Sequence, residues 1–501
     1  MTSIMFMPRV ARSTRARRRL QSILLVLGCL LLYLGLSRGW NLHPRLSSWT
    51  TQYNPLELGI PREHSLSISE PDETHPSSPM CADRLHAGYL QAFVDSATHN
   101  YCDTSSRTSL SCSGHKVHTQ TDSFCFISSA LLNQKSIDLD CKLRQWGEED
   151  IVNGKPPMLL KYLSQYWYNT GPGNIFRSRF IKFPRNNKLA AVDTSRQRTD
   201  MQTTTDTNLQ RDSFKILVRR EGSGNLWHCM MEIMSMTMTL DILHEKKHPI
   251  TGLPLFTTQD IENTQVLFLD NHSDGPYFDL WSMYAGQPPA RFSTNNTVEH
   301  TNLIVPLAGA SNPSWQGHWL EYHCGESVLL QTFSGRVLHF YGIEPEPRRG
   351  PLVLTFINRR DSRRLINQDE HLQKLELEFP EVQIRVVDFA ELTFVEQLRV
   401  AQSTDILVGV HGAGLTHGFF LPPGSAVIEL RPIRLKLRMY QMMTQSLGHQ
   451  YHTREGERHL YPDWNGDWQH DDVFMQESDV VDVVGEAIND IMRSRSADLK
   501  R

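Results

Sequence analysis

The sequence has no marked excess of charge of either sign. It contains 51 Lys and Arg against 55 Asp and Glu in 501 residues, a formal net charge of −4. Composition therefore gives no reason to expect nucleic acid as the main partner. No internal repeat with a period of about 20–50 residues is present either. Because a single core stops growing near about 250–300 residues, we expect two packed domains plus extensions.

Long uncharged apolar runs are missing except near the N terminus, at residues 20–36, where six arginines between Arg9 and Arg19 precede the run. As a helix rising about 1.5 Å per residue, this run would be about 26 Å long, close to the roughly 27 Å hydrocarbon thickness of the ER membrane. The positive-inside rule then predicts a cytoplasmic basic tail at 1–19, a transmembrane signal anchor at 20–38 and a lumenal remainder. The alternative is a cleaved signal peptide, but "YLGLSRGW" is a poor cleavage site.

The sequence also lacks a C-x-x-C pair, which would be typical of a zinc site. On the oxidising side of a membrane, the four cysteines from Cys102 to Cys141 instead predict one or two disulfides. Seven cysteines follow the apolar run, so at least one thiol stays free or pairs between chains. The only Asp-x-Asp, Asp138 to Asp140, lies among the cysteines and not after an aliphatic run, so we do not expect it to bind a metal ion.

Polar segments divide the lumenal part. Residues 39–80, rich in Pro, Ser and charge, predict a flexible stem, and residues 193–213 predict a long surface loop. From Cys81 to about Tyr168 the pattern is compact but irregular. The sequons at Asn271 and Asn295 permit N-glycosylation of a lumenal chain.

After Asp212, short apolar runs alternate with helical segments, which predicts parallel sheets covered by helices on both faces. The architecture that this pattern favours is α/β, with two halves and a cleft between them. The expected strands are 214–220, 264–270, 301–307, 351–359, 382–389, 405–412 and 426–430, and the expected helices are 225–243, 366–379, 394–404, a short one from 414, 434–448 and 480–494.

The stretch "DILVGVHGAGLTHGFF" places His411, Gly412, Ala413 and Gly414 between a buried strand and a helix. Ligands of doubly wound sheets bind at such turns, outside the carboxyl ends of the strands. Glycines let the backbone bend and approach a ligand, free N–H groups attract an anion such as a diphosphate, and the histidine can donate a hydrogen bond to it. In the alternative interpretation, His411 is an ordinary strand-end histidine and the glycines serve packing. We interpret His417, in the next helix, as packing.

Four arginines form a second candidate site in "NRRDSRRLINQDE", after another predicted strand. Guanidinium groups match phosphate geometry and keep their charge, so an arginine on the same edge as His411 would bind the diphosphate of a sugar nucleotide. A solvated basic turn explains most of these arginines, and we expect one or two of them to be functional.

In the first half, "GNLWHCMMEIMSM" places Asn225, His228 and Glu232 near the start of a helix. His228 and Glu232 are four residues apart and therefore on one helix face, where either could act as a general base. The alternative is that Glu232 is an ordinary, partly buried helix acid.

In the order "NLWHCMME", "NRRDSRRLINQDE" and "VVDFAELTFVEQLRVAQSTDILVGVHGAGLTHGFFLPPGSAVIEL", the chain resembles glycosyltransferase family 61 over roughly 212–450. The stretch around Cys102 to Cys125 is most similar to members that add N-acetylglucosamine to protein domains. The resemblance implies a GT-B-type fold of two Rossmann-like domains facing a cleft. The N-terminal domain, 81–335, would hold the acceptor, and the C-terminal domain, 336–501, the UDP-sugar.

The resemblance further implies inverting, metal-independent transfer from a UDP-sugar with no cofactor. It places the donor at Arg359, Arg363, Gly412, Ala413, Gly414 and Asn225, with catalytic roles for Glu232, His228 and His411. We expect N-acetylglucosamine transfer to Ser or Thr of secreted or membrane protein domains, by a type II single-pass protein of the endoplasmic reticulum or Golgi. Two alternatives stay open: a UDP-xylose or other pentose transferase acting on a glycan, and an inactive lumenal glycan-binding protein.

Overall fold

The computed structural model describes residues that all lie within one compact unit, Glu63–Arg501. The predicted tail, the anchor at 20–38, the stem at 39–80 and the sequon at Asn295 lie outside the described residues. Within the described part, no helix is both long and apolar enough to cross a membrane. The described residues are 85–117, 120–151, 157–163, 171–184, 213–247, 252–292, 298–316, 325–346, 348–458 and 467–498.

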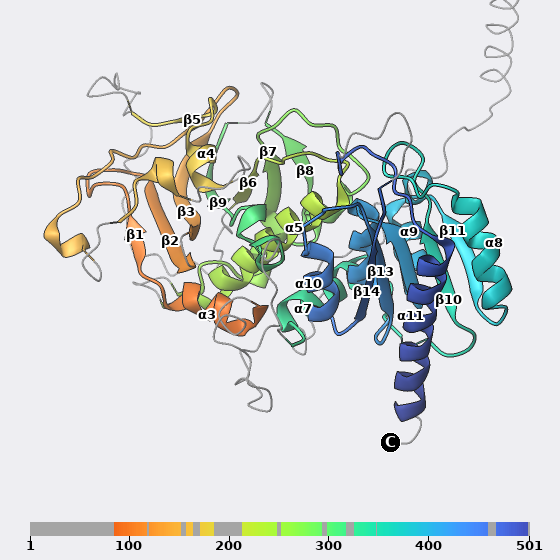
Figure 1. Ribbon diagram of the computed structural model, residues 1–501. Helices are drawn as coiled ribbons and strands as arrows, with labels where there is room; N and C mark the ends of the chain where they lie inside the picture. Colours follow the sequence, from red (N-terminus) through yellow and green to blue (C-terminus); the bar gives the residue numbers. More distant parts are fainter. Residues whose placement is uncertain are drawn as a thin grey trace, which may run out of the picture. The chain divides into compact units, whose positions relative to one another are not determined.

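The first sheet is mixed (Figure 1). Its main path is β1-β2-β3-β9-β6-β7-β8, antiparallel from β1 to β9 and parallel from β9 to β8. All five residues of β6, "FKILV", are buried, as predicted for a strand covered on both faces. The strands are β1 (Thr98–Asn100), β2 (Ser109–Val117), β3 (Gln120–Leu132), β4 (Ile137–Asp138), β5 (Ile181–Lys182), β6 (Phe214–Val218), β7 (Thr264–Phe268), β8 (Gln287–Arg291) and β9 (Glu299–Val305).

The region after Cys81, expected to be irregular, contains the antiparallel strands of the first sheet. Strands β2 and β3 form a long hairpin, and β3 pairs with β9 of the parallel part. The hairpin buries Leu110, Cys112 and Ile127 in a core shared with Leu267 of the parallel strands. Serines and a glycine leave "SLSCSGHKV" with few large apolar residues, so this strand escaped the sequence pattern.

Helix α5 (Leu226–Glu245) is the long helix of the first half and is buried almost all round, which explains its Met-rich composition. The other helices of this half are α3 (Ala87–Asp95), α4 (Pro172–Phe176) and α6 (Pro313–Gln316), with short 3₁₀ segments η1 (Glu148–Asp150), η2 (Leu160–Tyr162), η3 (Thr258–Asn263), η4 (Asp279–Ser282) and η5 (Gly309–Ser311).

The second sheet is wholly parallel, in the order β11-β10-β12-β13-β14, and confirms the predicted alternation of strands and helices. Strand order reverses beside β10, because the chain places β11 on one side of it and β12 on the other. The elements are β10 (Val353–Ile357), α8 (Gln368–Glu378), β11 (Gln383–Val387), η7 (Phe389–Glu391), α9 (Phe394–Gln402), β12 (Ile406–Val410), η8 (Ala413–Phe420), β13 (Ala426–Arg431), α10 (Met439–Ser446), β14 (Gln450–Glu455) and α11 (Glu477–Asp498).

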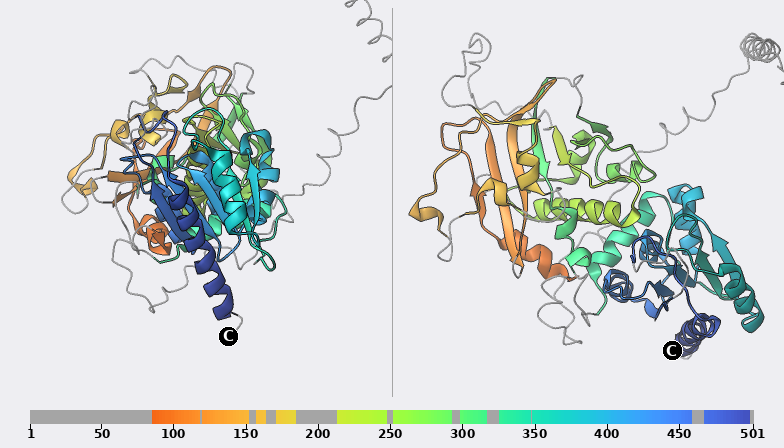
Figure 2. Two further views of the ribbon diagram at one scale, coloured as in Figure 1. Left: turned by 45° about the vertical axis from the view of Figure 1, so that its right-hand side comes forward. Right: turned by 45° about the horizontal axis from the view of Figure 1, so that its top comes forward.

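Alternate residues of these strands face different layers. Leu354, Val408 and Ile428 share one core with α8 and α11, and Figure 2 gives two views of α11 beside this sheet. The predicted apolar stripe of α11, Val480 to Ile491, lies in that core. Residues one position out of phase, such as Glu429, therefore face the other layer, where η8 and α10 pack on β13.

Helix α7 (Val328–Phe340) contains the predicted domain boundary at 335/336. Its Arg336 pairs with Asp241 of α5 at 2.7 Å, and its Ser334 hydroxyl donates to the carbonyl of Phe419 in η8 at 2.5 Å. The helix thus contacts elements from both halves. The division at 335/336 stays a prediction, and the boundary falls inside a helix and not in a linker.

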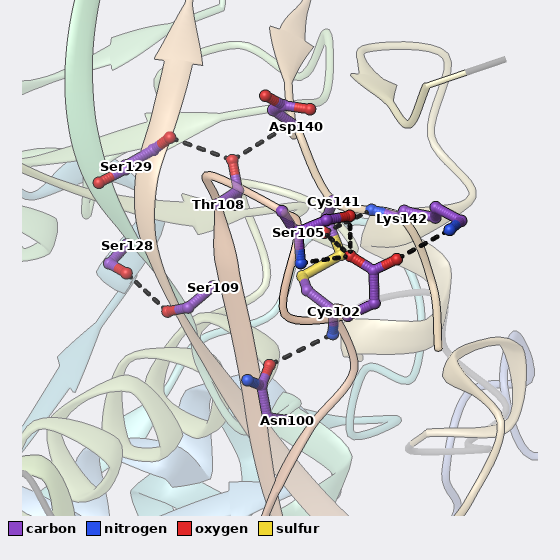
Figure 3. Close-up of a disulfide and its surroundings, with 12 residues drawn as sticks. Asn100, Cys102, Ser105, Thr108, Ser109, Ser128, Ser129, Asp140, Cys141 and Lys142 are labelled. Carbon is purple, nitrogen blue, oxygen red and sulfur yellow. Dashed lines mark hydrogen bonds and ion pairs between the residues drawn. A yellow bond between two sulfur atoms is a disulfide. The ribbon is translucent and has the colours of Figure 1, made fainter. Parts of the chain in front are cut away.

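Two disulfides fasten the hairpin region, as predicted: Cys112–Cys125 joins β2 to β3, and Cys102–Cys141 closes the loops beside them (Figure 3). Cys229 is a free, buried thiol. The carboxylates of the Asp-x-Asp are engaged locally, because Asp138 accepts a hydrogen bond from Asn133 and Asp140 pairs with Arg107, both at 2.6 Å.

Candidate functional site

The turns after β10 and β12 meet where the strand order reverses. Parallel sheets open a crevice at such a point, because the connections from neighbouring strands leave toward opposite faces. The segment after β10 carries the four arginines, and the segment after β12 begins with His411. Arg363 Nη1 donates to the carbonyl oxygen of His411 at 2.9 Å, which ties the two turns together.

A buried carboxylate holds the ring of His411. Its Nδ1 is hydrogen-bonded to Glu429 of β13, and the other oxygen of Glu429 accepts from the hydroxyl of Tyr451 in β14. His411 and Glu429 are both buried, and the parallel register sets Glu429 against Gly409, two residues before His411. The imidazole orientation is therefore fixed through Nδ1. Sequence reasoning missed Glu429, although one acid inside the aliphatic strand "AVIEL" was a usable signal.

The four arginines fall into two classes. Arg360 is exposed and pairs with Asp388 and Glu391, while Arg364 is exposed and pairs with Asp472 at 2.6 Å. Arg359 and Arg363 are half-buried, and in the described part of the chain neither lies within ion-pair distance of a carboxylate. Their hydrogen bonds run to carbonyl oxygens, from Arg359 to Ser362 and from Arg363 to His411. The first two form the predicted solvated turn, and the last two leave positive charge available at the crevice.

On the first sheet, the segment after β6 and the start of α5 form the other half of the candidate site. Asn225 is the N-cap of α5, with its side chain accepting from the backbone N–H of His228. Nδ1 of His228 is hydrogen-bonded to the carboxylate of Glu221, three residues after β6. Sequence reasoning missed Glu221; its position at the carboxyl end of a predicted strand was the available signal.

Glu232 lies deeper than expected. It is 5% exposed, and one of its oxygens accepts from the backbone N–H of Glu221 at 2.9 Å. A Cβ at Gly309 would lie 2.7 Å from Cγ of Glu232, so η5 packs directly on this side chain. Glu232 supports the loop that carries Glu221, and it is Glu221 that contacts the imidazole of His228.

A chain of ring contacts joins His228 to His411. His228 packs edge-on against Trp315, with ring centroids 4.8 Å apart, and Trp315 lies 6.4 Å from Trp227. Tyr440 of α10 then contacts both Trp227, at 5.5 Å, and His411, at 5.2 Å. The two candidate histidines, far apart in sequence, therefore border one aromatic cluster.

In a comparison with known protein families, residues 226–428 match the family model Glycosyltransferase 61. The chain is therefore similar to glycosyltransferase family 61 over this segment. The matched segment contains both candidate histidines and all four arginines. The resemblance stated from sequence is confirmed.

Proteins similar to this chain carry the name EGF domain-specific O-linked N-acetylglucosamine transferase. The Drosophila melanogaster protein is 27% identical over 261 residues, 50% of this chain and 47% of that one. The Mus musculus protein is 42% identical over 111 residues, 21% of each chain, and the Xenopus laevis protein 37% over 148 residues, 29% of this chain and 28% of that one. The matched part thus spans about half the length of the fly relative and less of the others.

Burial shifts the pKa of ionisable groups at the candidate site. It raises the pKa of Glu232 well above the ordinary value, and the negative charge of Glu221 adds to the rise. Burial also raises the pKa of Glu221, against the hydrogen bond and charge of His228. Burial, together with the charge of Arg359, lowers the pKa of Arg363 to about 10, which leaves its guanidinium charged at neutral pH.

His417 is a structural residue of the second sheet's half. Its ring stacks on Phe389 with centroids 3.8 Å apart, and its nitrogens hydrogen-bond to the carbonyl of Gly414 and to Gln397. Burial lowers the pKa of His417 to about 4, so the ring is neutral at physiological pH. This geometry agrees with the packing interpretation.

Gly412 leaves room for an arginine and does not form a tight bend. Its φ of 164° is extended backbone, which any residue adopts, but a Cβ there would lie 2.1 Å from Nη1 of Arg359. Gly414 likewise faces Ile357, at 3.0 Å. The expectation of a sharp glycine bend is corrected: these glycines leave room for Ile357 at the end of β10 and for Arg359 just after it.

Gly412→Ala should therefore displace the Arg359 guanidinium. We expect donor affinity to fall by about 10-fold or more, since a misplaced charged hydrogen bond costs about 1.5–3 kcal/mol. Isothermal titration of UDP into wild type and variant measures the effect. Gly424→Ala is not a suitable control because its φ is positive, whereas a Cβ at Gly335 in α7 meets nothing within 4 Å. Gly335→Ala should bind as wild type, and equal affinities for all three proteins would contradict the assignment.

Proposed function

We propose that this chain is an inverting glycosyltransferase that moves N-acetylglucosamine from UDP-N-acetylglucosamine to Ser or Thr hydroxyls of secreted or membrane protein domains. The observation that carries the proposal is the pair of half-buried guanidiniums, Arg359 and Arg363, that meet no carboxylate among the described residues, beside the turn at His411 in the segment that matches glycosyltransferase family 61. The names of the relatives support the sugar and the class of acceptor.

The donor diphosphate would lie against the turns after β10 and β12. Arg359 and Arg363 would neutralise its charge, taking the part that a divalent cation plays in other transferases, so the proposed reaction is metal-independent. His411, fixed through Nδ1 by Glu429, presents its other ring nitrogen for a hydrogen bond to the diphosphate. Ala413 and Gly414 line the same turn and, with Gly412, complete the proposed donor site.

The acceptor hydroxyl would approach from the side of His228. In a single inverting displacement the hydroxyl oxygen bonds to the anomeric carbon, the bond from that carbon to the diphosphate breaks, and a base removes the hydroxyl proton. His228 fits this role better than Glu232, because it is partly exposed and held through Nδ1 by Glu221, whereas Glu232 is buried beneath the loop. Asn225, as the N-cap, positions the first turn that carries His228 and lies within the proposed cleft.

A GT-B arrangement belongs to the proposal, with the first-sheet half, 81–335, on the acceptor side and the second-sheet half, 336–501, on the donor side. The disulfides support a lumenal location, since such bonds persist in oxidising compartments. With the apolar run at 20–36, this supports a type II single-pass protein of the endoplasmic reticulum or Golgi, with Asn271 and Asn295 as glycosylation sites.

UDP release with a panel of UDP-sugars, measured for wild type and His411→Ala, tests the proposal. We expect wild type to release UDP fastest with UDP-N-acetylglucosamine and a folded protein acceptor, and His411→Ala to be slower by about 100-fold or more, the cost of one preorganised leaving-group donor. Release with UDP-xylose alone would establish the pentose transferase instead. No donor-dependent release would leave the inactive glycan-binding protein as the function.

A further inference from the structure

The loop between β6 and α5, residues 221–225, has backbone donors that the described part of the chain does not use. Among the described residues, no hydrogen bond leaves the N–H of Gly222, Ser223 or Gly224. Gly222 and Ser223 are half-buried, and Gly224 is exposed. The loop follows a parallel strand and ends at the helix turn that carries His228. The unused N–H groups therefore lie beside the proposed base.

Arg220, directly before loop 221–225, holds the loop in one position. Its buried guanidinium pairs with Asp270 at 2.9 Å and also donates to the carbonyl oxygens of residues 272–274, after β7. The hydroxyls of Ser223 and Ser273 share a hydrogen bond of 3.0 Å between the same two segments. A ligand that binds a loop fixed in this way does not have to order it, which lowers the entropic cost of binding.

Nothing in the described part of the chain requires glycine at positions 222 and 224. Neither Gly222 nor Gly224 has the left-handed φ that favours glycine, and a Cβ on either would meet no atom within 4 Å. Gly275, which packs on the same loop, differs on both points: its φ is 75°, and a Cβ there would lie 2.1 Å from the carbonyl oxygen of Ser223. A residue without a side chain also lets a ligand approach the backbone closely. The two glycines therefore mark a face of the loop where another main chain can come within hydrogen-bond distance.

The charges at loop 221–225 favour a neutral ligand. The loop contains the carboxylate of Glu221 and no Lys or Arg, and the guanidinium of Arg220 before it is already paired with Asp270. Carboxylates repel a phosphate, whereas an uncharged carbonyl oxygen accepts a hydrogen bond from an N–H group. The diphosphate of the donor thus suits the arginine turn of the other half, and a polypeptide main chain suits this loop.

We propose that loop 221–225 binds the main chain of the acceptor polypeptide beside the Ser or Thr that is modified, by hydrogen bonds from its N–H groups to acceptor carbonyl oxygens. The hydroxyl of Ser or Thr is carried on Cβ, so the acceptor main chain must lie close to the base. Trp315, which is partly exposed and 4.8 Å from the ring of His228, forms the apolar side of the same site. The inference rests on the proposed function, because it takes His228 as the base and a polypeptide as the acceptor.

Steady-state kinetics of Gly222→Ala combined with Gly224→Ala tests the proposal, with a folded secreted domain that carries one acceptor Ser as substrate. The KM for this domain should rise by about 5- to 150-fold, as expected for the loss of two hydrogen bonds. The KM for UDP-N-acetylglucosamine should stay unchanged. The melting temperature should not fall, because neither added Cβ meets another atom. If it does fall, Gly224→Ala alone should still raise the KM for the domain by about 2- to 12-fold.

Gly325→Ala is the matched control. Gly325 is exposed, lacks a left-handed φ, and a Cβ there would also meet nothing within 4 Å. Its neighbour Glu326 faces Gly448, just before β14, so it lies at the edge of the second sheet opposite the donor site. This variant should keep both KM values.

Binding of the same domain with its acceptor Ser changed to Ala separates recognition from chemistry. Isothermal titration in the presence of UDP should show that wild type binds it and that the double variant binds it more weakly, by the factor seen in the KM.

The possible failures are distinguishable. If the double variant keeps its KM and affinity for the domain, or raises only the KM for the donor, the loop assignment is wrong and the proposed function stands. A rise in the KM for a free glycan acceptor without a rise for the domain also overturns the assignment, because the loop then binds glycan. If wild type transfers no sugar to the domain or to any other protein acceptor, the proposed function itself fails.

Discussion

Arg359→Ala should weaken UDP binding by about 10- to 100-fold and raise the KM for the sugar donor, while Arg360→Ala should leave both unchanged. The two residues are adjacent on one turn, but Arg360 is exposed and paired with Asp388 and Glu391, whereas Arg359 is half-buried beside Gly412 without such a pair. Charge-assisted hydrogen bonds to phosphate contribute about 1.5–3 kcal/mol each, which sets the expected range. Isothermal titration and donor-saturation kinetics measure it.

Arg360→Ala is a matched control for Arg359→Ala, since each variant removes one arginine from the same segment. Arg359→Ala combined with Arg363→Ala should abolish measurable donor binding, because the turn then has no unpaired cation among the described residues of this segment. Equal losses for Arg359→Ala and Arg360→Ala would show that only the net charge of the turn matters, and the assignment of the diphosphate to Arg359 would be withdrawn.

His228→Ala should lower kcat by about 100- to 10,000-fold with little change in the KM for donor, as expected for removal of a general base. Glu232→Gln should keep most of the activity, because this side chain is buried and touches the loop of Glu221, not the imidazole. The activity of Glu221→Gln should lie between those of the other two variants, since this change loosens the orientation of the His228 ring but keeps the ring. Steady-state kinetics with saturating acceptor separates the three.

Thermal melting of wild type and Glu232→Gln at a series of pH values is the control for these kinetic measurements. The folded-state pKa of Glu232 is raised, so the folded protein holds this proton more tightly than the unfolded chain does. The contribution of Glu232 to stability is therefore fully present below its unfolded pKa, about 4.3, and is lost as pH rises through the folded value. As the pH rises through the folded-state pKa of Glu232, wild type should lose thermal stability relative to Glu232→Gln. An inactive but stable Glu232→Gln would instead identify Glu232 as the base.

Sequence patterns could predict the second sheet because its signals are local. Strand β12 is a continuous buried run of "ILVGV", and α11 places an apolar residue on each turn, so periodicity alone indicates strand and helix. The β2–β3 hairpin was missed because its strands are serine-rich and one of them bulges where it pairs with β9. Its stability comes from pairing and disulfides between distant residues, which no local window contains.

By itself, the sequence determined the alternation of strands and helices after residue 212, the similarity to glycosyltransferase family 61, and the two turns that carry His411 and the arginines. Each of these depends on residues within short segments. Only the tertiary structure decided which side chains act together. Glu429 reaches His411 through the register of β12 with β13, and Glu221 reaches His228 through the path of one loop. Among the described residues, two of the four arginines pair with carboxylates on other segments and two do not, because pairing depends on positions in space that chain spacing does not specify.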